Sequence, residues 1–164
     1  MSDVPTSNRA TVIQLSGALF SPEGKLLLLE RALAPSPSPT RGEGRTDGES
    51  LWELPGGVAD FGEPPEVALM RTFLENTDIE VVPDRPMGAW SELRKDDGRQ
   101  LYIVHIDFVV RTTGALTGVD INKESYRSFA WLPQKEALEH LGTPAMKSVG
   151  EHAFAMLSRT RRNS

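Results

Sequence analysis

The chain has 164 residues, which suits one domain with one sizeable core. Its charged and hydrophobic fractions, 25% and 38%, are ordinary for a globular protein. The formal net charge of -5 disfavours a nucleic-acid polymer as partner, because such a partner requires a cationic surface. The absence of cysteine excludes disulfides, thiolate metal sites and cysteine nucleophiles. Neither a signal-peptide core nor an apolar run near the roughly 20 residues of a bilayer span is present. We therefore expect a cytoplasmic protein without a membrane partner.

The first predicted elements are two strands joined by a turn. Residues 9–20 are rich in β-branched and apolar side chains, and residues 21–24 (Ser-Pro-Glu-Gly) are a turn signal. The apolar run 25–31 fits a helix or a strand, and its brevity favours a buried strand. Residues 34–50 are rich in proline, glycine and charge, which predicts a flexible insertion within a single domain of residues 1–164. A lid over a site is the alternative, because long loops are often functional.

The rest of the chain alternates strands and helices. Pro65 suits the first turn of a helix, and the Asp-Asp-Gly-Arg sequence at residues 96–99 predicts a hairpin. Strands are predicted at residues 52–54, 87–94, 100–112 and 127–132, and helices at 65–76, from Pro133 to about 141 and from Pro144 to about 159. Mixed strands with helices on both sides indicate a layered α/β domain.

The most specific pattern is WELPGGVADFGEPPEVALMRTFLENTDI at residues 52–79. It resembles the Nudix box of the Nudix hydrolases, which it matches in register at Gly57, Glu63, Arg71, Phe73, Glu75 and Ile79. Thr72 and Asn76 stand where the box has glutamate, and Asp78 stands where it has glycine, so the box is degenerate. The resemblance extends over roughly residues 9–158. It implies a Nudix-like α/β/α sandwich with a mixed β-sheet.

The resemblance also implies a reaction. Nudix hydrolases cleave a diphosphate linkage with Mg²⁺ or Mn²⁺, which neutralises charge on the phosphate oxygens. We therefore expect a hydrolase of a nucleoside-diphosphate derivative or a related small-molecule diphosphate, with a weakened or altered metal site. Two alternatives stay open: an inactive Nudix-fold protein that binds a ligand or partner, and a biosynthetic enzyme with non-standard chemistry on this fold.

Four glutamates are candidates for metal binding or catalysis. Glu75 matches a metal ligand of the box, although it could instead be a helix residue paired with Arg71. Glu63 also matches the box as a candidate ligand, and its preferred role is to hold Arg71. Glu53 could replace a lost ligand or be an exposed strand residue. Glu124 is the candidate catalytic base, because family members often take a glutamate from the corresponding loop, and Asp120 is its alternative.

A second group of residues is expected to contact the substrate. Gly56 and Gly57 would let the backbone approach a ligand or would simply form a tight turn. The charge of Arg31 at a strand end could reach a phosphate. A base or an apolar chain could pack on the aromatic residues Phe61, Trp90 and Tyr102, although aromatic residues at strand spacing are more often core. His105 is expected to be hydrogen-bonded within a sheet. The last helix is expected to pack in the core, and a homodimer interface is the alternative.

Overall fold

The structure is a computed structural model that describes residues 8–32 and 51–164. The predicted insertion at residues 34–50 lies outside the described residues. In chain order, the elements are β1 (Arg9–Ala18), β2 (Leu26–Arg31), β3 (Leu51–Glu53), β4 (Gly56–Val58), α1 (Pro65–Thr77), β5 (Val81–Asp96), β6 (Arg99–Thr112), β7 (Tyr126–Leu132), α2 (Gln134–His140) and α3 (Pro144–Arg162).

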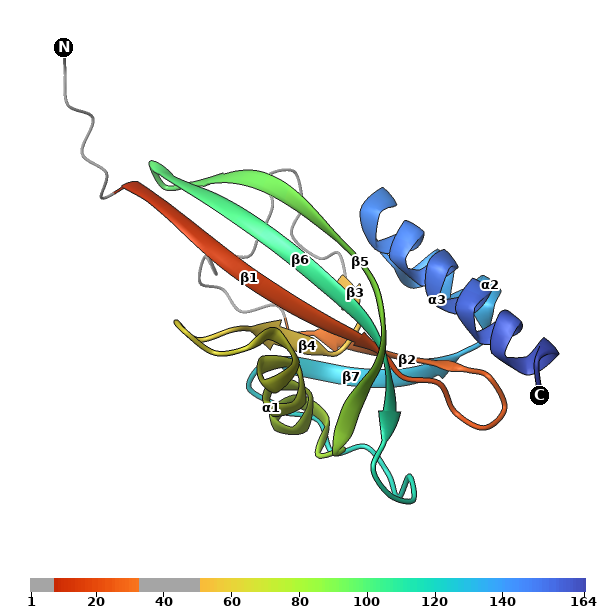
Figure 1. The fold of residues 1–164 in the computed structure, drawn as a ribbon. Coiled ribbons are helices and arrows are strands. Elements are labelled where there is room, and N and C mark those ends of the chain that lie inside the picture. The colour runs from red at the N-terminus through yellow and green to blue at the C-terminus, as the bar shows by residue number, and fades with distance from the viewer. Residues whose placement is uncertain (1–7, 33–50) are drawn as a thin grey trace, which may run out of the picture.

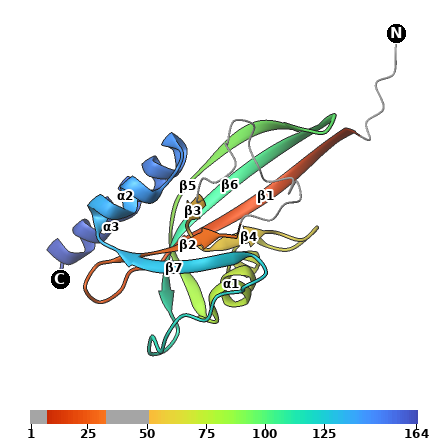
Figure 2. The ribbon, with the colours of Figure 1, turned by 180° about the vertical axis from the view of Figure 1, so that it is seen from behind.

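The strands form two sheets. One has the order β4-β1-β6-β5 and is mixed, because β1 and β6 are parallel and the other pairs are antiparallel. The other has the order β3-β2-β7 and is antiparallel. Helix α1 lies on one side of the strands. Helices α2 and α3 pack against each other on the other side (Figure 1, Figure 2). The predicted α/β/α sandwich with a mixed sheet is therefore confirmed.

Strand β2 is the centre of the core. Its side chains alternate in direction, as strand geometry requires. Leu27 and Leu29 pack in one cluster with residues of α1, whereas Leu26 and Leu28 pack in a second cluster with residues of α2 and α3. All four leucines are fully buried. The predicted buried strand is confirmed, and it separates the two helical layers.

Helix α1 forms where the sequence predicts it. Pro65 occupies its first turn, and its buried face includes Ala68, Leu69 and Phe73. The helix ends at Asp78, which has the left-handed conformation, with φ 57°, and whose N–H donates to the Leu74 carbonyl oxygen over 2.9 Å. Glycine adopts this conformation most easily, and aspartate does so better than most other residues. The helix therefore ends at the position where the Nudix box has glycine.

Two parts of the sheet differ from the sequence prediction. Strand β4 was not predicted, because three residues with two glycines carry no strand signal. Strand β5 starts at Val81 rather than residue 87, so it includes Pro83 and Pro86. It lies at the sheet edge and shifts register beside both prolines, so these prolines interrupt the ladder only locally.

Helix α3 begins with a cap and packs on the core. The Thr143 hydroxyl accepts a hydrogen bond from the Met146 N–H over 3.2 Å, and Ala153 and Phe154 are buried. This confirms the expected core role, whereas the homodimer remains a prediction. No helix in residues 8–32 and 51–164 is long and apolar enough to cross a membrane.

The end of α1 gives a test of the fold. Asp78→Gly should raise the free energy of unfolding by about 0.5–1 kcal/mol, because glycine adopts positive φ without a steric penalty. Asp78→Ala should lower it by about 1 kcal/mol, since alanine lacks that freedom. Urea unfolding of both variants and the parent measures the two changes. A glycine variant less stable than the parent would contradict the left-handed helix end.

Candidate functional site

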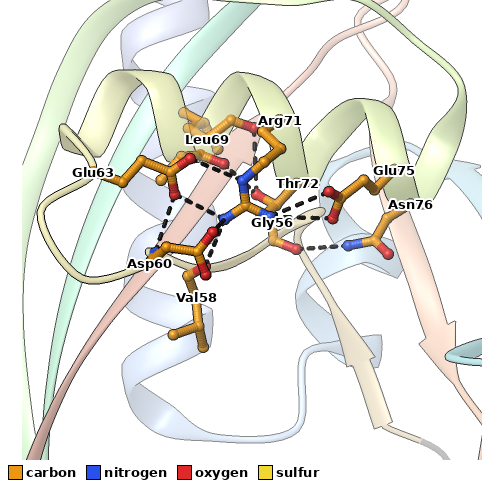
Figure 3. A network of polar contacts seen from close by, with 10 residues as sticks. Gly56, Val58, Asp60, Glu63, Leu69, Arg71, Thr72, Glu75 and Asn76 are labelled. Carbon is orange, nitrogen blue, oxygen red and sulfur yellow. Dashed lines mark hydrogen bonds and ion pairs between the residues drawn. The ribbon is translucent and has the colours of Figure 1, made fainter.

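Arg71 holds the degenerate box together (Figure 3). Its guanidinium Nε and Nη2 donate to the two carboxylate oxygens of Glu63, each over 2.8 Å. Nη1 donates to Glu75 over 3.2 Å, and Nη2 also donates to the Val58 carbonyl oxygen over 3.1 Å. A bidentate arginine–carboxylate pair fixes orientation as well as charge. The geometry therefore agrees with the preferred role of Glu63, which is to hold Arg71.

These contacts shift two pKa values. Hydrogen bonds from Arg71 and from the Asp60 N–H lower the pKa of Glu63 to about 2. The hydrogen bond to Glu63 is also the main reason that the pKa of Arg71 is raised, with a further contribution from Glu75. Both side chains therefore stay charged at neutral pH.

The two residues that replace box glutamates make contacts within the protein. Thr72 is buried, and its hydroxyl donates to the Ala68 carbonyl oxygen over 2.8 Å. The side-chain amide of Asn76 donates to the Gly56 carbonyl oxygen over 2.8 Å (Figure 3). Both side chains therefore use their polar atoms to fix α1, in one case to itself and in the other to the first residue of β4.

Gly56 and the box glycine, Gly57, are both required for close packing. A Cβ atom on Gly56 would lie 2.0 Å from the Leu15 carbonyl oxygen, and one on Gly57 would lie 2.8 Å from the Thr72 methyl carbon. Both distances are too short for any larger residue to fit without movement. Tight packing of the turn is therefore sufficient to explain both glycines, and their role in substrate binding remains a prediction.

The donor atoms of the box do not fit a Mg²⁺ centre. Mg²⁺ prefers oxygen ligands in octahedral geometry, usually including one or two carboxylates. The carboxylates of Glu63 and Glu75 are bound to Arg71, and Asn76 presents N–H rather than oxygen to the Gly56 carbonyl. Within residues 8–32 and 51–164, no three His, Cys, Asp or Glu side chains group as metal ligands. The metal roles of Glu53, Glu63 and Glu75 therefore remain predictions, and this arrangement does not support them.

A cavity of about 400 Å³ lies next to the β1–β4 ladder, and no residue from 56 to 79 lines it. Its floor is the face of the mixed sheet that carries Ser16, Trp90 and Asp107. One wall comes from the end of β2 and from β3. The other comes from the start of α3, where Met146 and Val149 supply apolar surface. A cleft with apolar walls and a few polar groups is typical of a small-molecule site.

A stacked ring pair and a buried carboxyl group lie on the cavity floor. The rings of Trp90 and His105 are parallel within 2°, with centroids 3.7 Å apart. The Trp90 Nε1–H donates to Asp107 over 3.1 Å, and the Ser16 hydroxyl donates to the other carboxylate oxygen. Burial raises the pKa of Asp107, although both hydrogen bonds act against the rise. Asp107 is therefore a buried carboxyl group on the cavity floor, with each of its two oxygens hydrogen-bonded to a neighbouring side chain.

The other charged groups of the cavity are paired. Glu92 forms an ion pair with Arg94, and its carboxylate also lies 3.2 Å from His105 Nε2. Arg31 Nη2 and the Tyr126 hydroxyl both donate to Glu53, over 2.6 and 2.9 Å. Glu53 thus lines the cavity and positions Arg31, and the expectation that it is an exposed strand residue is wrong.

Besides the box residues, Phe61, Tyr102 and Glu124 also lie outside this cavity. Phe61 is fully exposed, so its expected alternative as a core residue is wrong. Tyr102 pairs with Leu93 across the β5–β6 ladder and lies on the opposite sheet face from Trp90. Glu124 is exposed in the loop before β7, and this loop reaches α1 through a hydrogen bond from the Asn122 N–H to the Asn76 carbonyl oxygen over 3.1 Å. The roles of all three remain predictions.

Sequence reasoning missed most of the polar cavity residues, among them Gln14, Ser16, Glu92, Arg94 and Asp107. One of them left a signal. Asp107 interrupts an apolar strand sequence, IVHIDFVV, and a carboxyl group in such a run must be paired or functional. The others lie at alternate positions of strands that are distant in sequence, so no local pattern groups them.

The low pKa of Glu63 predicts an acid-dependent loss of stability. Its folded-state pKa is below the ordinary value, so Glu63 stabilises the fold above about pH 4.5, and this contribution is lost as the pH falls towards about 2. Glu63→Gln should therefore reduce the stability difference between neutral pH and pH near 2.5. Glu66→Gln, which removes an exposed carboxylate from the same helix, is the control. Equal pH dependence of the free energy of unfolding in parent and Glu63→Gln would contradict the pairing with Arg71.

Comparison with known proteins identifies the family. A family model described as the NUDIX domain matches residues 13–153. A MutT-like protein of Streptomyces ambofaciens is 26% identical over 129 residues, which are 79% of this chain and 68% of that protein.

Solved structures share the fold at low sequence identity. A MutT protein from Methanosarcina mazei Go1 superposes with a TM-score of 0.62 at 19% identity, covering 92% of this chain and 96% of that one. A Caenorhabditis elegans Ap4A hydrolase superposes with a TM-score of 0.60 at 16% identity, covering 90% of this chain and 97% of that one. The matched family model spans most of the chain, from β1 to α3, and includes the whole box; this protein therefore belongs to the NUDIX domain family.

Proposed function

We propose that this chain binds a nucleoside-diphosphate derivative, or a related diphosphate with an aromatic group, and that ligand binding rather than efficient metal-dependent hydrolysis is its main activity. The observation that carries the proposal is the cavity floor, where the Trp90–His105 ring pair lies beside the buried Asp107 carboxyl group. A flat apolar surface next to hydrogen-bonding groups suits a heteroaromatic ring, because the face of such a ring stacks and its edge forms hydrogen bonds.

The charges of the cavity support a ring rather than a phosphate as its occupant. Its lining residues include two arginines, Arg31 and Arg94, and three carboxyl groups, so it has no excess of positive charge. Both arginines are already bound to carboxylates. The phosphate end of the ligand would then lie outside the cavity, and Arg31 is the cation at the β2–β3 wall that it would meet first.

Diphosphate hydrolysis is the second candidate. Nudix hydrolases generally use a divalent metal such as Mg²⁺ or Mn²⁺, and the chain retains the Glu63–Arg71–Glu75 arrangement of the box. The loop with Glu124 also contacts the end of α1. In this reading Glu75 would hold the metal weakly, and Glu124 would be the base. Two missing box glutamates weigh against it, because neither Thr72 nor Asn76 can replace a carboxylate.

Ligand binding can be tested on the cavity floor. Trp90→Ala should weaken binding of the preferred nucleoside diphosphate at least about tenfold, since stacking of a base on an aromatic ring is worth about 1–3 kcal/mol. Leu93→Ala is the matched control, because Leu93 lies on the same strand but on the other sheet face. Calorimetric titration of a panel of nucleoside diphosphates measures both. The proposed function is wrong if the parent binds no member of the panel, or if the two variants bind equally well.

Hydrolysis needs a separate assay. Phosphate release from the same panel and from dinucleoside polyphosphates should be followed with Mg²⁺, with Mn²⁺ and with a chelator. We expect release with either metal to stay at the level of the chelator arm. Metal-dependent turnover that Glu75→Gln abolishes would establish the second candidate in place of the first.

A further inference from the structure

The contact between Asn76 and Gly56 joins the box helix to the first residue of β4, at the turn between β3 and β4. The Asn76 Nδ2–H donates to the Gly56 carbonyl oxygen over 2.8 Å, and the half-buried side chain points towards Gly56 (Figure 3). The Asn76 carbonyl oxygen in turn accepts from the Asn122 N–H over 3.1 Å. This residue therefore connects three segments: the turn at Gly56, α1 and the loop before β7.

The Gly56 carbonyl oxygen has little freedom to move away from its partner. Gly56 pairs with Ser16 in the β1–β4 ladder, and the Gly17 N–H donates to the carbonyl oxygen of Pro55, the residue before Gly56. The turn is packed so closely on β1 that a Cβ atom on Gly56 would overlap the Leu15 carbonyl oxygen. Whatever side chain occupies position 76 therefore faces a fixed acceptor.

An acidic side chain at position 76 would place two oxygen atoms against each other. Two acceptors at hydrogen-bond distance repel unless a proton or a cation lies between them. The asparagine amide avoids this repulsion, because its N–H carries the positive end of a dipole towards the carbonyl. Position 72, one helical turn before Asn76, also has its polar atom used within the protein. The buried Thr72 hydroxyl donates to the Ala68 carbonyl oxygen, and the Thr72 methyl group packs against Gly57.

We propose that the Asn76 amide takes the place of a cation in this box, so that α1 is fixed to the Gly56 turn without a divalent metal. The proposal goes beyond the proposed function, because it concerns how the box is held and does not depend on any ligand of the cavity. It predicts that divalent cations do not stabilise the parent protein. It also predicts that replacing the donating nitrogen of Asn76 by oxygen makes the stability of the protein depend on them.

The test is Asn76→Asp, which keeps the shape of the side chain and replaces the donating nitrogen with oxygen. In chelator, this variant should melt about 3–6 °C below the parent, because a paired group becomes unpaired and faces an acceptor. Millimolar Mg²⁺ or Mn²⁺, added alone as the probe, should restore at least half of that loss. The parent should melt at the same temperature in metal and in chelator.

Two further variants separate the cation effect from loss of a hydrogen bond. Asn76→Ala removes the amide without adding a charge, so it should lose stability that metal does not restore. Asn122→Asp is the matched control, because the Asn122 side chain accepts from the Glu124 N–H and an aspartate can accept equally well. It should melt like the parent in both conditions.

Three results would overturn the proposal: a saturable rise in the melting temperature of the parent with Mg²⁺ or Mn²⁺, an Asn76→Asp variant as stable as the parent in chelator, or a loss in Asn76→Asp that metal does not restore. If Asn76→Asp fails to fold even with metal, the equivalence with a cation is likewise refuted. Failure of the cavity variants to affect ligand binding would leave each of these outcomes unchanged, so the two proposals fail separately.

Discussion

The guanidinium group of Arg71 is the contact on which the box depends. It joins the loop before α1 through Glu63, the helix itself through Glu75, and the end of β4 through the Val58 carbonyl oxygen. Because these partners come from separate segments, the contact fixes α1 in both position and rotation. The same rotation places Thr72 on Gly57 and Asn76 on Gly56. An ion pair that would contribute little on an open surface therefore determines the geometry of the whole box.

The box and the cavity place different demands on the sequence. In the box, the Thr72 hydroxyl and the Asn76 amide nitrogen donate hydrogen bonds to backbone carbonyl oxygens of the protein. The Glu75 carboxylate is paired with Arg71. In the cavity, Asp107 is buried with a raised pKa beside a ring pair and an opening large enough for a small molecule. A fold can lose one function of its site and retain another, because function resides in particular residues rather than in the architecture. This separation is the physical basis for proposing binding without efficient hydrolysis.

The sequence predicted the parts of the structure that have local causes. The helix at residues 65–76 has an apolar face and a proline in its first turn, and residues 96–99 form the predicted hairpin turn between β5 and β6 with Asp97 and Gly98 at positive φ. Strand β4 was missed because it exists only through its pairing with β1, which is distant in sequence. The partner of Asn76 could not be predicted either, since it is a backbone oxygen 20 residues away. The cavity assembles from β1, β2, β3, β5, β6 and the start of α3, and among the polar residues that the sequence analysis missed, only Asp107 left a signal of its own.

The central claim is that side chains of the protein, and not a metal ion, hold the box in place. The most direct measurement is a crystal structure of the parent grown with Mn²⁺ and a nucleoside diphosphate, with anomalous diffraction data to locate the metal. We predict that the Asn76 amide stays within hydrogen-bond distance of the Gly56 carbonyl oxygen, with no anomalous peak beside Glu75 or Gly56. A manganese ion bound to the Gly56 carbonyl oxygen and the Glu75 carboxylate, with the Asn76 side chain turned away, would contradict the claim.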